Sequence, residues 1–121
     1  MDKRGLKVGD YLYESWGYDQ TNIDFYKVTE LVGKSSVKII PVKGTFVEDT
    51  DYKVAPTDEV ADYDVLLKFK PKDEEYPRGW KPEDGPIMKR AKDGWVRLSS
   101  GYSASLYDGE PKYETPSYMG R

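Results

Sequence analysis

The chain of 121 residues contains no cysteine and no histidine. Without cysteine it can form no disulfide, no thiolate metal site and no cysteine nucleophile. Without histidine it lacks the side chain most often used as a general base near neutral pH and as a metal ligand. A serine–histidine–acid triad is therefore excluded, and an enzyme is the least supported class of function.

Long apolar runs are also missing. No stretch approaches the roughly 18 apolar residues of a membrane-spanning helix, and the N-terminal MDKRGLKVGDYLY lacks the apolar core of a signal peptide. We therefore expect a soluble, cytoplasmic protein without membrane contact. The net charge of −3 is too small to indicate a nucleic-acid binder by itself. We interpret the acidic residues within 48–64 as a solvated connection in preference to a docking patch.

Tyrosine is the abundant aromatic residue, with 11 copies against 3 phenylalanines and 3 tryptophans. Tyrosine can bury its ring and keep its hydroxyl in water, so it can edge a small core in a chain that is only 37% hydrophobic. The same side chain suits a binding surface. Ordinary burial statistics favour the structural role for most of these tyrosines.

The hydrophobic pattern predicts short strands and almost no helix, because β-branched and aromatic residues alternate between turn residues. Pro41 is expected to mark the end of its strand or an edge position, and Pro71 is expected to end a strand. Asp93-Gly94 is typical of a hairpin turn. One helical turn is expected at 57–63, and 72–86 has the composition of a long loop. The expected strands are 7–13, 23–31, 37–42, 64–71, 87–91, 94–98, 102–107 and 112–115.

These strands predict an all-β fold, a small single-domain SH3-like barrel over residues 1–115 with long loops and at most a short helix. An OB-like barrel or a small sandwich is the alternative. Residues 116–121 are expected to form a flexible tail.

The stretch ESWGYDQTNIDFYKV, residues 14–28, concentrates aromatic and polar side chains. Asp19, Asn22 and Asp24 could offer oxygen ligands to a hard cation, but the further ligands of a calcium loop are absent and Asp24 falls on an expected strand. Asp and Asn more often close turns by accepting backbone N–H groups. We therefore expect a polar-braced loop, with no metal and no cofactor.

Aromatic side chains that stack on bases or anchor protein partners form the predicted binding surface, together with nearby polar groups. Phe25 and Trp95 are expected in the core instead. The aromatics expected to be exposed are Trp16, Tyr18, Tyr26, Trp80 and Tyr107. The polar candidates are Asp19, Gln20, Asn22, Asp108 and Lys112.

Two motifs resemble those of a group of small bacteriophage and plasmid proteins. The first is Ser15–Asn22 followed by Phe25-Tyr26-x-Val28, and the second is Ala104–Tyr113, where Tyr107 stands in place of the group's frequent tryptophan. The motifs cover the N-terminal third and the C-terminal end, and the middle is unmatched. The resemblance implies a mobile-element origin and carries over no catalytic residue.

We therefore expect a non-enzymatic binding module of a phage or mobile element, such as an anti-defence or host-interaction protein that binds another protein. Its surface would combine the Trp16–Asn22 loop with the Tyr107–Tyr113 turn. A nucleic-acid-binding or nucleotide-binding barrel is the alternative, and a metal-dependent enzyme is the weakest reading.

Overall fold

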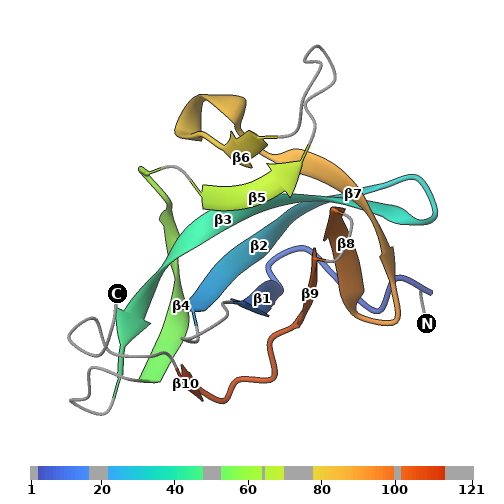
Figure 1. Ribbon diagram of the computed structural model, residues 1–121. Coiled ribbons are helices and arrows are strands. Elements are labelled where there is room, and N and C mark those ends of the chain that lie inside the picture. The colour runs from blue at the N-terminus through green and yellow to red at the C-terminus, as the bar shows by residue number, and fades with distance from the viewer. Residues whose placement is uncertain are drawn as a thin grey trace.

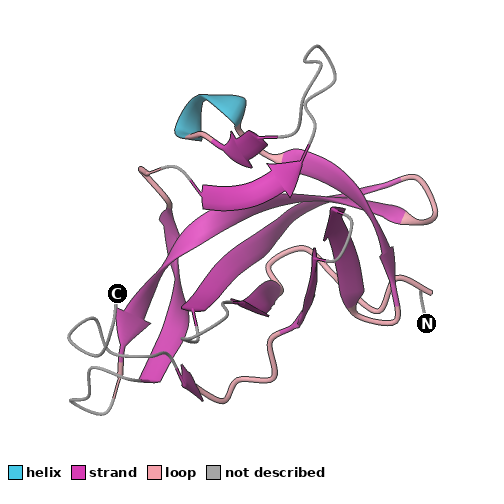
Figure 2. Cartoon of the chain, in the orientation of Figure 1, coloured by secondary structure: helices cyan, strands magenta, loops and turns pink. Residues whose placement is uncertain are grey.

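The computed structural model describes residues 3–16, 22–47, 53–63, 65–69, 78–99 and 102–113. Within these ranges the chain is almost entirely β-structure, with one short 3₁₀ helix, η1 (Pro82–Asp84) (Figures 1 and 2). The strands are β1 (Tyr11–Trp16), β2 (Asn22–Val32), β3 (Ser36–Phe46), β4 (Lys53–Val60), β5 (Val65–Phe69), β6 (Arg78–Trp80), β7 (Ile87–Lys92), β8 (Trp95–Ser99), β9 (Tyr102–Leu106) and β10 (Lys112–Tyr113).

Six of the strands close into an antiparallel barrel. β1–β2–β3 and β7–β8–β9 are two meanders, which pair with each other through β1–β9 and β3–β7. The predicted small all-β barrel is therefore confirmed. β4 continues the sheet from the distal half of β3, β10 pairs with β4, and β5–β6 form a separate two-stranded sheet.

Alternation along the strands creates the interior. On β2, Tyr26 and Val28 face inward and are fully buried, whereas Phe25 faces the opposite side of the sheet. Trp80 of β6 and Val65 of β5 belong to the same buried cluster as the inward residues of the barrel. The small β5–β6 sheet is therefore held to the barrel by apolar packing.

A second hydrophobic cluster lies on the outer side of β1–β4. It contains Ile23, Phe25, Val42 and Val54, and Tyr107 packs against it from the segment between β9 and β10. In Figure 1 this segment runs beneath β1 toward β4, where β10 forms. The expected burial of Phe25 is confirmed, because this residue is only 3% exposed.

The structure differs from three local predictions. The long loop expected at 72–86 contains β6 and η1. Residues 57–63 form no helical turn, because β4 runs to Val60 and is paired with β3. Pro41 does not end a strand, since β3 continues through it to Phe46. The Pro41 carbonyl accepts the Ala61 N–H at 3.0 Å. The missing N–H of Pro41 is on the same edge of β3 as this carbonyl, at the point where the partner of β3 changes from β7 to β4.

The N-terminal segment is anchored beside the β7–β8 hairpin. Arg4 is buried and donates to the carbonyls of Val32 at 3.3 Å and Ser36 at 2.9 Å. The Gly94 N–H donates to the Arg4 carbonyl at 2.8 Å. Asp93 (φ 50°) and Gly94 (φ 83°) form the predicted hairpin turn, which is confirmed.

Gly5 is expected to tolerate no larger residue. Its φ is +69°, and a Cβ placed there would lie 2.7 Å from the Gly94 nitrogen. Gly5→Ala should lower the free energy of unfolding by about 2–4 kcal/mol, from backbone strain together with the steric clash. The matched control is Gly33→Ala, with φ +57° and no atom within 4 Å, which should cost about 1 kcal/mol. Equal losses in urea unfolding would contradict the close contact.

Candidate functional site

Three predicted site residues lie together on the outer face of β1. Lys112 Nζ lies 3.0 Å from Asp108 Oδ1 and 4.6 Å from the centroid of the Tyr13 ring. Tyr107 meets the rings of Tyr13 and Phe25 edge-on, with centroid separations of 6.5 and 5.8 Å. These contacts bind the segment before β10 to the barrel, so they are structural contacts within the chain.

The charges in this turn stabilise one another. The Glu110 N–H and the Lys112 ammonium lower the pKa of Asp108, and the hydrogen bond to Asp108 raises the pKa of Lys112. Burial raises the pKa of Tyr107. Asp108 and Lys112 are thus already engaged with each other.

A similar cluster lies further along the same face. The Tyr11 hydroxyl donates to Asp58, and Lys27 Nζ lies 2.9 Å from the same carboxylate. The hydrogen bond to Asp58 raises the pKa of Tyr11, and the Tyr11 and Lys27 donors lower the pKa of Asp58. This cluster joins β1, β2 and β4.

The predicted exposure of Tyr26 and Trp80 was wrong. Both residues are fully buried in the barrel core, at 0% exposure. Trp80 Nε1 donates to the Gly85 carbonyl at 2.8 Å, so the polar edge of the indole is satisfied inside the protein. Neither ring can contact a partner without unfolding of its sheet.

The remaining predicted residues are only partly placed. Trp16 is the last residue of β1 and Asn22 is the first residue of β2, but their side chains lie outside the description. Tyr18, Asp19 and Gln20 lie outside the described residues, as does the predicted tail 116–121. Asp24 is on β2, as predicted.

A different aromatic residue is exposed. Trp95 was expected in the core, but it lies on the outer face of β8 and is 40% exposed, so that prediction was wrong. Val96 and Leu98 occupy the inward positions instead, with 0% and 1% exposure. The alternation Trp95-Val96-Arg97-Leu98 carried the signal, because Trp95 shares its face with the charged Arg97.

Trp95 lies in a groove with a volume of about 500 Å³, here called the Trp95 groove. Its lining comes from the N-terminal segment, the β2–β3 turn, and the outer face of β7 and β8. Lys92 is the direct cross-strand neighbour of Trp95. The lining includes Ala91, which is itself buried in the barrel core, and the four cationic residues Lys3, Arg90, Lys92 and Arg97.

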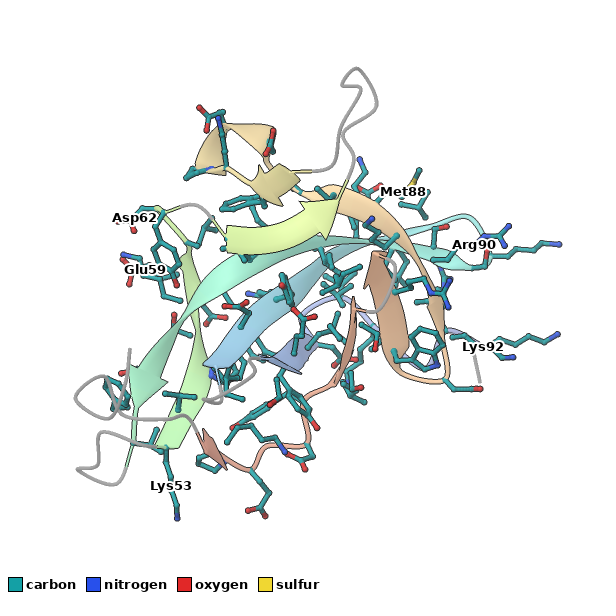
Figure 3. The ribbon with its side chains drawn as sticks, viewed as in Figure 1. Lys53, Glu59, Asp62, Met88, Arg90 and Lys92 are labelled. Atoms are coloured by element: carbon teal, nitrogen blue, oxygen red, sulfur yellow. The ribbon has the colours of Figure 1, made fainter. Side chains whose placement is uncertain are left out.

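These four cations differ from most others on the surface. Within the described ranges, none of them is within ion-pair distance of a carboxylate, although Asp93 also lines the groove. Five lysines elsewhere lie within 4.0 Å of a carboxylate, as Lys43 does with Glu59 at 3.3 Å and Asp62 at 3.1 Å. Figure 3 shows Glu59 and Asp62 on the opposite side of the molecule from Arg90 and Lys92. The small net charge thus conceals a local excess of positive charge.

One buried carboxyl group lies inside the barrel. Glu14 is 4% exposed and is the cross-strand neighbour of Asp24. Burial and repulsion from Asp24 raise the pKa of Glu14 to about 7. Among the residues that the structure describes, the buried hydroxyl of Tyr26 has no hydrogen-bond partner. Burial and the nearby carboxylates Asp24 and Glu14 raise the pKa of the Tyr26 hydroxyl well above its ordinary value. The Glu14 carboxyl group is therefore polar, enclosed and sensitive to pH.

Within the described ranges, no three acidic, cysteine or histidine side chains are arranged to hold a metal ion. The helical part of the same ranges contains nothing of the length and apolarity needed to cross a membrane. The chain matches no protein family, no curated protein and no solved structure. The inference of function therefore begins from the chemistry of the Trp95 groove.

Proposed function

We propose that the protein is a non-enzymatic binding module for nucleic acid and that the Trp95 groove is its interface. The observation that carries the proposal is the set of four exposed cations, without acidic partners among the described residues, around an exposed indole. Phosphates release bound counterions when such cations neutralise them, which is the main source of affinity in protein–nucleic acid contacts.

The net charge of −3 does not oppose this function. The Debye length in physiological salt is about 8 Å, so an approaching phosphate senses the charges near the groove more than those across the molecule. The acidic side chains of Glu59 and Asp62 lie on the far side and are paired with Lys43. Local charge, and not the sum over the chain, therefore governs binding.

Protein binding through the Trp16–Asn22 loop and the Tyr107–Tyr113 turn stays a prediction, as do the mobile-element origin and the anti-defence role. Most of that loop lies outside the described residues. In the turn, Tyr107 and Lys112 are already packed within the chain. The Trp95 groove offers cations that no described carboxylate pairs with, and we favour it for that reason.

The salt dependence of binding tests the proposed function. If the four cations each neutralise one phosphate, a plot of log K against log salt should have a slope of about −3 for a labelled oligonucleotide. Lys92→Gln should reduce the magnitude of this slope by about 0.7–0.9. Fluorescence anisotropy between about 50 and 200 mM salt measures both.

The matched control is Lys81→Gln, which removes one exposed lysine beside η1, outside the groove. It should leave the slope unchanged. Absence of binding at low salt, or a slope near zero, would refute nucleic acid as the ligand. A partner captured without salt dependence would then favour the protein-binding prediction.

A further inference from the structure

We infer that the Trp95 groove stacks an unpaired base on the Trp95 indole, so that the protein selects single-stranded over duplex nucleic acid. This inference rests on the proposed function, since it specifies which form of nucleic acid the groove accepts. It assigns Trp95 a role that charge alone does not provide.

The position of Trp95 supports stacking. Large apolar side chains on the surface of a soluble domain are most informative when they line a concave site, and Trp95 does so while 40% exposed. The inward residues Val96 and Leu98 hold β8 to the core, so the indole is carried by a paired strand and not by a loop. A platform on a rigid strand loses little conformational entropy when a base stacks on it.

The charges are arranged on several sides of the indole. Lys92 is its cross-strand neighbour, and Arg97 lies two residues along the same strand, about 6.6 Å away at Cα. Lys3 approaches from the N-terminal segment, which the Asp93 N–H holds by a 3.0 Å hydrogen bond to the Lys3 carbonyl. Phosphates on either side of a stacked base would each meet a cation.

The shape of the site favours a single strand. The groove volume of about 500 Å³ falls in the ~300–1,000 Å³ range of pockets that enclose small ligands. The exposed apolar part of its lining is the Trp95 indole, which a guest reaches by entering between the cations. In a duplex the base faces are stacked on neighbouring pairs and the phosphates are outermost, so only the cations of the groove could contact it. An unstacked base can also stack on the indole.

The test compares three labelled oligonucleotides of equal length, about 12 nucleotides, within the ~4–16 that a small barrel covers. They are oligothymidine, its duplex with oligoadenine, and an abasic strand with the same phosphates. Oligothymidine should bind at least about 10-fold more tightly than the other two, because stacking of even one base contributes that order of affinity. It should also quench part of the tryptophan fluorescence.

Variants of the indole separate stacking from charge. Trp95→Ala should weaken oligothymidine binding about 5- to 150-fold and leave the duplex affinity unchanged. Trp95→Phe should keep most of the affinity and lose the quenching. The matched control is Met88→Ala, an exposed apolar residue on the outer face of β7 outside the groove lining, which should change neither.

The outcomes distinguish this inference from the proposed function. Equal affinity for all three oligonucleotides, together with a steep salt slope, would overturn base stacking and leave nucleic-acid binding intact. No binding by any of them at low salt would overturn both. The wild-type comparison with the abasic strand decides the matter even if Trp95→Ala does not fold.

Discussion

Replacing Trp80 by alanine is expected to lower the free energy of unfolding by about 3–5 kcal/mol, the range for a buried aromatic residue. Trp80 is fully buried, belongs to the barrel core and pairs across β5–β6 with Val65. The substitution removes the ring and leaves a cavity. It also removes the indole N–H that donates to the Gly85 carbonyl at 2.8 Å. Urea unfolding followed by circular dichroism measures the change.

Trp95→Ala is the control for this prediction, because it makes the same chemical change at an exposed position. It should cost about 1 kcal/mol or less. Trp80→Phe should give an intermediate loss, since it keeps an aromatic ring but cannot donate to Gly85. Similar losses for Trp80→Ala and Trp95→Ala would contradict the assignment of Trp80 to the core.

Glu14→Gln is expected to stabilise the protein at pH 8 by about 2–3 kcal/mol and to have little effect at pH 4. The pKa of Glu14 is raised from its ordinary 4.5 to about 7 by burial and by Asp24. Between these two values the folded state binds more protons than the unfolded state. Stability from this group is therefore present below about pH 4.5 and is lost as the pH rises through about 7.

Glutamine mimics the neutral carboxyl group and removes this loss. Unfolding by urea at pH 4 and pH 8, on either side of the isoelectric point of about 5.1, measures the difference. The control is Glu30→Gln, an exposed carboxylate of β2 that is 3.8 Å from Lys38 and should contribute under about 1 kcal/mol. A Glu14→Gln effect that is the same at both pH values would show that ionisation is not the cause.

The sequence was sufficient to predict the fold class, because alternation and turn chemistry are local. The Asp93-Gly94 hairpin and the alternating β2 appear in the structure where they were expected. The strand end predicted at Pro41 is absent from the structure. A proline is tolerated inside a strand where its missing N–H has no partner to bond, and at Pro41 this depends on how β7 and β4 pair with β3. The prediction of a helical turn at 57–63 was wrong for a similar reason, since the pairing of β4 with β3 overrides the local helix signals.

The site was harder to predict than the fold. Exposure of an aromatic residue depends on which side of its strand faces the barrel, and a register shift of one residue reverses the answer. Tyr26 follows the inward phase of β2, whereas Trp95 follows the outward phase of β8. The cations of the groove could not be identified either. Arg90 and Arg97 lie on one predicted hairpin, but Lys3 joins them only because the N-terminal segment is hydrogen-bonded to the turn of that hairpin.

The closure of the barrel by β1–β9 has a consequence for folding kinetics. Leu12 pairs with Leu106, so the contact spans most of the chain and closes a large loop. Such non-local pairing slows folding, because loop-closure entropy is lost before the contacts compensate for it. On the ribosome, β1–β2–β3 can form a meander early, but the outer edge of β1 and the first half of β3 stay unpaired until β9 and β7 emerge. During synthesis these edges are the part of the protein most exposed to pairing with other chains.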